Sequence, residues 1–320
     1  MAEIGKDLEK VIQILKNGDL VAIPTETVYG LAANAFNPNA VKKIFEVKGR
    51  PTFNPLIIHS DSLEKIEDFV EDIPEIAKKL IDKFSPGALT YVFNKKKSVP
   101  DIVTGGKRTV AVRIPNHKLT LELLSKLEFP LSAPSANPFG FISPTNPYHV
   151  EEQLGDKINY ILDGGECNIG LESTIISFLS EKPEILRFGG VSIENIEKII
   201  GKVNIKVNIL NEFPDAPGQL KSHYSPNHKL ILGNIEELIK EYKFEKEKIG
   251  IITFNKTINS IPIQNQRQLS VNSDLEEAAS KLFKAMRELD KLDIDIIFAE
   301  NFPDIEIGKA INDRLKRASN

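Results

Sequence analysis

Hydrophobic and polar positions in the first two hundred residues follow two periods in turn, one typical of strands and one typical of helices. Short apolar runs predict strands at residues 20–24, 55–59, 87–93, 109–114, 129–133, 159–162, 173–178 and 184–187. Apolar stripes at helical spacing predict helices at 8–15, 38–48, 62–70, 73–84, 117–127, 147–154 and 192–200. This alternation predicts an α/β fold with a twisted, open, mixed sheet and flanking helices.

The pattern is interrupted after residue 207 and restarts at residue 229. The segment between them contains Pro214, Pro217 and Gly218, which are typical of a linker. Beyond it, strands are predicted at 229–232, 249–254, 268–271 and 294–299, and helices at 234–242, 274–291 and 307–318. We therefore predict a first domain (1–207), a linker (208–228) and a small Rossmann-like α/β domain (229–320).

Composition narrows the class of protein. The 320 residues are 41% hydrophobic and 27% charged, which suits a folded chain of two domains. A net charge of −4 and a pI near 5.9 argue against a protein whose affinity rests on neutralising nucleic-acid phosphates. Because no apolar run reaches the roughly 18 to 20 residues that cross a bilayer, and no basic start precedes an apolar stretch, we expect a cytoplasmic protein without membrane contact. The single cysteine, Cys167, excludes an intrachain disulfide and a multi-cysteine zinc site, and we assign it no role.

A polar segment, Pro-Thr-Glu-Thr-Val-Tyr-Gly at 24–30, directly follows the first of these strands. Open α/β sheets usually bind ligands at the carboxyl ends of their strands, where these hydroxyls are expected. Lys48 and Arg50 follow at the end of a helix that Asn37 and Pro38 begin. Taken singly, cations at a helix end are explained by the helix dipole and solvent, and the polar segment by an ordinary loop.

Further polar residues interrupt apolar strands. Arg113 lies in an otherwise apolar strand, where either a structural carboxylate or a ligand anion would satisfy it. Small residues at 132–137 allow close approach of a bound group. His59 follows an apolar run and is either a ligand-binding residue or a core imidazole, whereas His117 and His149 are expected to be surface residues without a role.

Together and in this order, the motifs resemble the threonylcarbamoyl-AMP synthase family, in its form with a YrdC-like domain and an additional carboxyl-terminal domain. The resemblance rests on residues 24–30, 48–50, 54–56 with His59, 135–137, 172–174, Arg187, 223–226 and 308–315. It implies a nucleotidyltransferase that converts ATP, L-threonine and bicarbonate into threonylcarbamoyl-AMP and pyrophosphate, the first step of threonylcarbamoyladenosine formation in tRNA. A downstream threonylcarbamoyl transferase machinery would take over the product.

The resemblance also implies roles for individual residues. Lys48 and Arg50 are expected to stabilise the transferring phosphate. The residues expected to hold L-threonine are Thr27, His59, Arg113, Ala133 and Ser173. The residues expected to surround ATP are Arg50, Asn54, Thr109, Ser135, Asn137, Ser143, Arg187, His223 and Tyr224. Mg²⁺ is expected on the ATP phosphates without a dedicated protein site, and residues 221–226 are expected to close over the substrates as a lid.

Two alternatives remain beside the synthase. An RNA-binding module of YrdC-like fold would use the basic residues at 95–97 and 107–108, but the acidic pI and the lack of an RNA-binding signature oppose it. A carbamoyl transferase acting on a maturation protein would need zinc-finger segments, which one cysteine excludes. Direct tRNA binding, the oligomeric state and the role of the second domain stay open.

Overall fold

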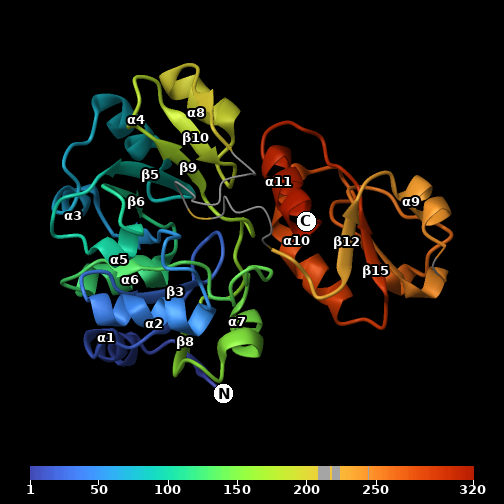
Figure 1. Ribbon diagram of the computed structural model, residues 1–320, viewed down its shortest axis with the longest axis horizontal. Coiled ribbons are helices and arrows are strands. Elements are labelled where there is room, and N and C mark those ends of the chain that lie inside the picture. Colours follow the sequence, from blue (N-terminus) through green and yellow to red (C-terminus); the bar gives the residue numbers. More distant parts are fainter. Residues whose placement is uncertain (208–216, 218–223, 244) are drawn as a thin grey trace. The chain divides into compact units, whose positions relative to one another are not determined.

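The computed structural model describes residues 1–207, 217, 224–243 and 245–320 (Figure 1). The chain forms two compact units, one of residues 1–139, 143–168 and 172–220, the other of residues 140–142, 169–171 and 221–320. Residues 140–142 and 169–171 thus cluster with the second unit, although the sequence pattern places them in the first domain. Residues 221–223 of the predicted lid, including His223, lie outside the described residues, whereas residues 224–226 are described.

The first unit holds a large mixed sheet. Its strands are β1 (Glu3–Gly5), β2 (Val21–Ile23), β3 (Gly30–Asn34), β4 (Ile57–His59), β5 (Leu89–Asn94), β6 (Thr109–Arg113), β7 (Leu131–Ser132), β8 (Tyr160–Leu162), β9 (Thr174–Ser177), β10 (Glu184–Arg187) and β11 (Asn204–Ile205). Their order across the sheet is β1-β8-β2-β3-β7-β4-β6-β5-β9-β10-β11. Parallel pairs such as β4–β6 and β5–β9 occur beside antiparallel pairs such as β5–β6 and β2–β3, which confirms the predicted α/β class with a mixed sheet.

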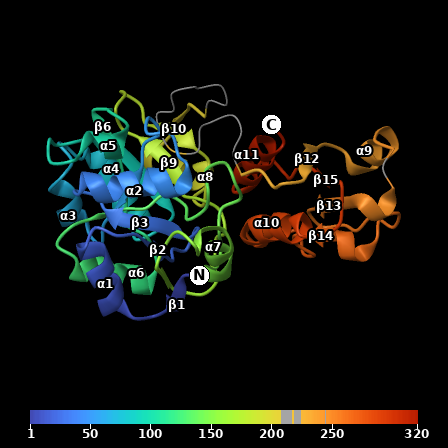
Figure 2. The same cartoon turned by 60° about the horizontal axis from the view of Figure 1, so that its bottom comes forward.

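Eight helices accompany this sheet in the described part of the first unit. They are α1 (Leu8–Lys16), α2 (Pro38–Lys48), α3 (Leu63–Glu67), α4 (Glu75–Phe84), α5 (Asp101–Thr104), α6 (Lys118–Lys126), α7 (Pro147–Leu154) and α8 (Ile193–Ile200). Apolar residues of α2, α4, α5, α7 and α8 join one large core cluster, whereas those of α1 and α6 join a second cluster. In Figure 2, α1 and α6 accordingly lie on the opposite side of β2 and β3 from α2.

A smaller apolar cluster marks the face of the sheet on which candidate site residues lie. Its members are Ile57, Val92, Ala111, Ile175 and Leu186. Because side chains alternate along a strand, His59 shares the face of Ile57, and Arg113 shares the face of Ala111. The register pairs His59 with Arg113 across β4 and β6, so both side chains leave the sheet at the same end.

The residues that begin and end helix α2 determine where Lys48 and Arg50 lie in the chain. The Asn37 side chain accepts hydrogen bonds from the first backbone N–H groups of α2, and Pro38 occupies its first position. Gly49 ends the helix with φ of 63°, a left-handed conformation that favours glycine. Two cations therefore flank a sharp turn of the chain, as the sequence predicts.

The second unit has a parallel sheet of four strands. They are β12 (Lys229–Leu232), β13 (Ile249–Thr253), β14 (Gln266–Gln268) and β15 (Ile296–Ala299), in the order β12-β15-β13-β14. Its helical segments are α9 (Ile235–Glu241), η1 (Lys246–Lys248), η2 (Ile263–Asn265), α10 (Leu275–Asp290) and α11 (Gly308–Ala318). All pairings are parallel, as expected for a Rossmann-like unit. Among the residues described in either unit, no helix is both long and apolar enough to cross a membrane.

Candidate active site

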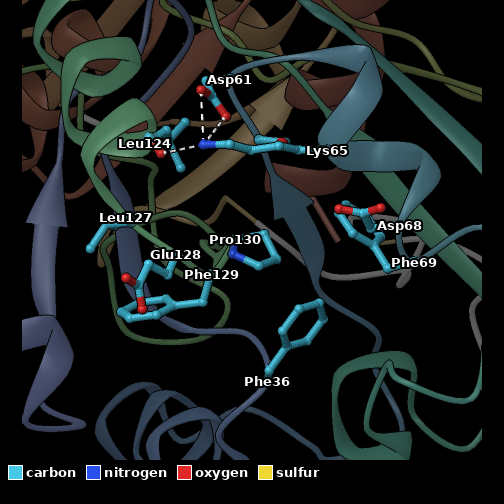
Figure 3. A pocket seen from close by; sticks show the side chains of 11 residues that line it. Phe36, Asp61, Lys65, Asp68, Phe69, Leu124, Leu127, Glu128, Phe129 and Pro130 are labelled. Carbon is cyan, nitrogen blue, oxygen red and sulfur yellow. Dashed lines mark hydrogen bonds and ion pairs between the residues drawn. The ribbon is translucent and has the colours of Figure 1, made fainter.

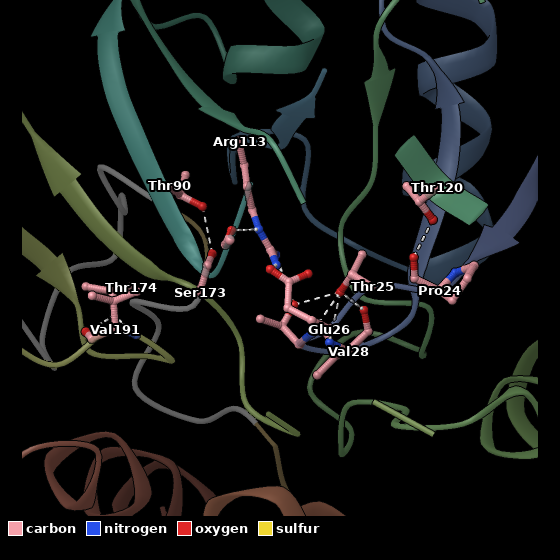
Figure 4. A network of polar contacts seen from close by, with 12 residues as sticks. Pro24, Thr25, Glu26, Val28, Thr90, Arg113, Thr120, Ser173, Thr174 and Val191 are labelled. Atoms are coloured by element: carbon pink, nitrogen blue, oxygen red, sulfur yellow. Dashed lines mark hydrogen bonds and ion pairs between the residues drawn. The ribbon is translucent and has the colours of Figure 1, made fainter. Parts of the chain in front are cut away.

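Arg113 is the centre of a buried polar network at the end of β6 (Figure 4). Its Nε donates to the Gly87 carbonyl at 3.0 Å, and its Nη1 donates to the Thr27 hydroxyl at 2.9 Å. Its Nη2 lies 2.7 Å from a carboxylate oxygen of Glu26, with both side chains buried. Of the two alternatives for Arg113, the structure supplies the salt bridge within the protein.

A chain of hydroxyls fixes the loop that carries Glu26. The Thr25 hydroxyl donates to the Val28 carbonyl at 2.7 Å and accepts from the backbone N–H groups of Thr27 and Val28. The Thr27 hydroxyl lies 2.8 Å from the same oxygen. Since the hydrogen of the Thr25 hydroxyl is donated to the Val28 carbonyl, the Thr27 hydroxyl donates to the Thr25 oxygen and accepts from Nη1 of Arg113. The loop is therefore held in one conformation next to the guanidinium.

His59 is buried beside this network. Burial, assisted by the positive charge of Arg113, lowers the pKa of its imidazole from 6.5 to about 3, so the ring is neutral near pH 7. Its Nδ1 has no hydrogen-bond partner among the described residues. A neutral ring with an unused nitrogen is suited to contact a hydroxyl or amino group of a ligand.

Lys48 is tied to the loop that follows β7. Its ammonium donates to the backbone carbonyls of Ser135 and Asn137. Burial, and the charge of Arg50 after it, lower the pKa of Lys48 well below its usual value. The predicted residues Lys48, Ser135 and Asn137 are thus brought together, with the lysine holding the backbone of the other two.

Arg50 is fixed in the same way by the segment before β4. Its guanidinium donates to the Asn54 side-chain oxygen at 2.7 Å, to the Asn54 carbonyl at 3.1 Å and to the Pro55 carbonyl at 2.7 Å. It also lies over the ring of Phe139, 6.0 Å from its centre. The Asn54 amide nitrogen is buried and donates to none of the described residues.

A third group of predicted residues meets at the amino end of β9. Arg187 donates to the carbonyl and the hydroxyl of Ser173, and also to the Pro217 carbonyl at 3.1 Å. The Ser173 hydroxyl lies 2.7 Å from that of Thr90 on β5. Close by in sequence, Glu172 accepts a hydrogen bond from Ser143 at 2.6 Å.

Other predicted site residues lie elsewhere or show no polar side-chain contact. Thr109 is at the opposite end of β6 from Arg113 and lines a hollow of about 330 Å³ together with Lys107, Arg108 and Lys206. Ala133 is buried, and its backbone N–H donates to Ile57. Tyr224 belongs to the second unit, where it stacks on Phe283 with ring centres 5.5 Å apart and lies beneath Arg314.

The two histidines expected at helix starts on the surface are at helix starts but are only partly exposed. His117 precedes α6 and His149 lies in the first turn of α7, and both are half-buried. His117 approaches the Gly164 carbonyl at 3.4 Å, and His149 contacts Thr145 and Asn146. No role was predicted for Glu26, although the arginine in the apolar strand at 109–114 was the signal that a carboxylate partner was needed.

Several polar atoms in this region are buried without a hydrogen-bond partner among the described residues. They are both carboxylate oxygens of Glu26, Nδ2 of Asn54, Nδ1 of His59, Nη2 of Arg113 and Oγ of Ser132. Such atoms are rare in folded proteins because leaving them unpaired costs about 1–3 kcal/mol each. Three of these atoms belong to the predicted site residues Asn54, His59 and Arg113, and a bound ligand would supply hydrogen-bond partners for them.

A second hollow lies away from these residues, between α3, α6 and the loop after β3 (Figure 3). It has a volume of about 160 Å³ and is lined by Phe36, Phe69 and Phe129 among others. Lys65 within it is already paired with Asp61 and the Leu124 carbonyl. Since small-molecule sites usually have about 300–1,000 Å³, this hollow is too small for a nucleotide.

Both units of the chain match models of known protein families. Residues 13–189 match the family model of Sua5, YciO and YrdC proteins, described as telomere recombination. Residues 191–320 match the model described as threonylcarbamoyl-AMP synthase, C-terminal domain.

Individual relatives agree over nearly the whole chain. It is 44% identical over 317 residues to the threonylcarbamoyl-AMP synthase of Pyrococcus abyssi, covering 95% of this chain and 92% of the relative. It is 40% identical over 314 residues to that of Bacillus subtilis, covering 96% and 91%. A crystal structure of P. abyssi Sua5 complexed with L-threonine matches with a TM-score of 0.92 at 41% identity, covering 100% of this chain and 97% of that one. The chain therefore belongs to the threonylcarbamoyl-AMP synthase family.

Proposed function

We propose that this protein is an L-threonylcarbamoyladenylate synthase, which forms threonylcarbamoyl-AMP and pyrophosphate from ATP, L-threonine and bicarbonate. The observation that carries the proposal is that buried polar atoms of Glu26, His59 and Arg113 have no hydrogen-bond partner among the described residues, in a chain of this family. The similar P. abyssi protein was crystallised with L-threonine, which supports an amino-acid substrate here.

The proposed reaction needs no nucleophile from the protein. The free amine of threonine and bicarbonate form a carbamate as a C–O bond of bicarbonate breaks and water is released. A carbamate oxygen then attacks the α-phosphorus of ATP while pyrophosphate leaves. Negative charge grows on phosphate oxygens, so fixed cations and N–H donors lower the barrier. We assign this task to Lys48 and Arg50. The contacts of Arg50 with Asn54 and Pro55 support the assignment, because they hold the guanidinium in place before a substrate arrives.

We assign the remaining residues as the family resemblance implies. L-threonine would contact Thr27, His59, Arg113, Ala133 and Ser173, and ATP would contact Arg50, Asn54, Thr109, Ser135, Asn137, Ser143, Arg187, His223 and Tyr224. The grouping of Arg187 with Ser173 and of Ser143 with Glu172 supports a continuous site. Thr109 and Tyr224 are the assignments with the least support, since Thr109 lies at the opposite end of β6 from Arg113 and Tyr224 stacks on Phe283 in the second unit.

The wider setting of the reaction is also part of the proposal. The enzyme would be a cytoplasmic nucleotidyltransferase in tRNA modification, whose product passes to a threonylcarbamoyl transferase machinery. Mg²⁺ would enter as the ATP complex. This assignment rests on the chemistry of the ion, because Mg²⁺ usually keeps several water ligands and binds through substrate phosphates.

Synthesis of the adenylate is the direct test. The full chain is incubated with ATP, L-threonine and bicarbonate, and threonylcarbamoyl-AMP and pyrophosphate are measured. Omitting each substrate in turn should abolish the product, and Arg113→Lys should weaken L-threonine binding more than ATP binding, because lysine keeps the charge but lacks the planar fork. A wild-type chain that binds RNA but releases no pyrophosphate would favour the RNA-binding alternative.

A further inference from the structure

Glu26 is a buried carboxylate that lacks hydrogen-bond donors among the described residues. The residue is 6% exposed, and its closest charged partner is Nη2 of Arg113 at 2.7 Å. The two atoms form an ion pair without the alignment of a hydrogen bond, and neither oxygen of Glu26 accepts a hydrogen bond from the described residues. An ionised carboxylate usually accepts several hydrogen bonds, so donors are missing at this position.

The position of the carboxylate is set by its neighbours and not by its own contacts. The Thr25 hydroxyl accepts from the backbone N–H groups of Thr27 and Val28 and so fixes the backbone around Glu26, and Figure 4 shows Thr25 and Glu26 in this loop. Arg113 is held by Gly87 and Thr27 through two other nitrogens. The acid is therefore held beside the guanidinium whether or not it forms hydrogen bonds.

The pair has the charge pattern of a complement to an α-amino acid. An α-amino acid carries a carboxylate and an ammonium group on the same carbon atom. Arg113 and Glu26 offer the opposite charges side by side. An ammonium group brings three N–H donors, which the two oxygens of Glu26 lack. Apolar ligands and simple anions have no N–H groups that could donate to the Glu26 oxygens.

We propose that Glu26 binds the α-ammonium group of the amino-acid substrate while Arg113 binds its carboxylate. This inference rests on the proposed function and names the residue that selects an amino acid over other carboxylic acids of the same shape. A hydroxy acid in place of the amino acid would lose the charge contact with Glu26 and also lacks the nitrogen from which the carbamate forms. Recognition and reactivity then depend on the same atom of the substrate.

The test compares two ligands in the absence of ATP. Calorimetry measures the affinity of the full chain for L-threonine and for (2S,3R)-2,3-dihydroxybutanoate, in which a hydroxyl replaces the ammonium. The wild type should prefer L-threonine, and Glu26→Gln should bind L-threonine about 10- to 100-fold more weakly with little change for the hydroxy acid, the scale of one charge-assisted hydrogen bond. Glu122→Gln, at an exposed position of α6, is the matched control and should behave as the wild type.

The outcomes separate a substrate contact from a structural salt bridge. If Glu26→Gln weakens both ligands by the same factor, Glu26 acts only by positioning Arg113, and the inference is wrong. If Glu26→Gln does not fold, Glu26→Asp retains the charge and should keep the preference for L-threonine. Equal affinity of the wild type for both ligands overturns the inference without any variant. Failure of the proposed function is distinguishable, because a wild type that prefers L-threonine but makes no threonylcarbamoyl-AMP retains the ammonium contact and lacks the synthase activity.

Discussion

Acidification should destabilise the first unit through His59. The folded protein keeps this imidazole neutral, because burial and Arg113 lower its pKa to about 3, whereas in the unfolded chain its pKa is 6.5. Between these two values the unfolded state binds one more proton than the folded state. The contribution of His59 to the free energy of unfolding is therefore fully present above pH 6.5 and is lost as the pH decreases toward 3.

The size of the effect follows from the two pKa values. Each pH unit inside the window changes the free energy of unfolding by about 1.4 kcal/mol for one proton. Lowering the pH from 7 to 5 crosses about one and a half units of the window, so His59 should contribute a loss of about 2 kcal/mol. A loss of that size is a large part of the roughly 5–15 kcal/mol that stabilises a typical domain.

Urea unfolding of the wild type and of His59→Gln at pH 7 and pH 5 measures this contribution. Glutamine does not titrate, so the variant should lose about 2 kcal/mol less than the wild type over the same interval. Other titrating groups, including His117, are present in both proteins and cancel in the difference. Equal losses in the two proteins would refute a neutral buried imidazole at His59.

Three further predictions concern other parts of the chain. Arg50→Ala should raise the barrier to pyrophosphate release by about 2–4 kcal/mol, the scale of one electrostatic donor, and an unchanged rate in a folded variant would contradict its role. Gly189→Ala should reduce synthesis and L-threonine binding together, because its Cβ would collide with the backbone of Glu172, Ser173 and Thr174; normal binding by calorimetry would count against this. Tyr224→Ala should destabilise the second unit by about 3–5 kcal/mol, as expected for a buried aromatic ring that stacks on Phe283, and unaltered thermal unfolding would exclude a packing role.

The periodic parts of the fold were predictable from the sequence. Helix α2 was predicted with the observed bounds, because Asn37, Pro38 and Gly49 are strong local signals. Strand β3 was missed, since Gly30 to Asn34 consists of glycine, alanine and other residues that do not favour strands, and its pairing with β2 decides its structure. The strand expected at 268–271 lies at Gln266–Gln268, where pairing with β13 and not hydrophobicity sets the bounds.

The candidate site was predictable in composition and less so in arrangement. Arg113 was selected because a buried cation on an apolar strand needs a partner, whereas the roles of Arg50 and Ser173 followed from the family resemblance and stay predictions. Which partners they have depends on strand register over long separations, and no local pattern encodes it. The ion pair of Glu26 with Arg113 and the contact of Lys48 with backbone carbonyls are of this kind.

The pairing of β5 with β9 determines when the site can first exist during protein synthesis. Leu89 lies opposite Thr174, so a strand made early waits for a partner that is translated much later. Ser173 and Arg187 join Thr90 only once β9 and β10 have left the ribosome, which takes on the order of ten to forty seconds at about 5–20 residues per second. A nascent chain that stops before Arg187 therefore lacks the contacts that join Thr90, Ser173 and Arg187, and these three residues come together only in a chain that has already made β9 and β10.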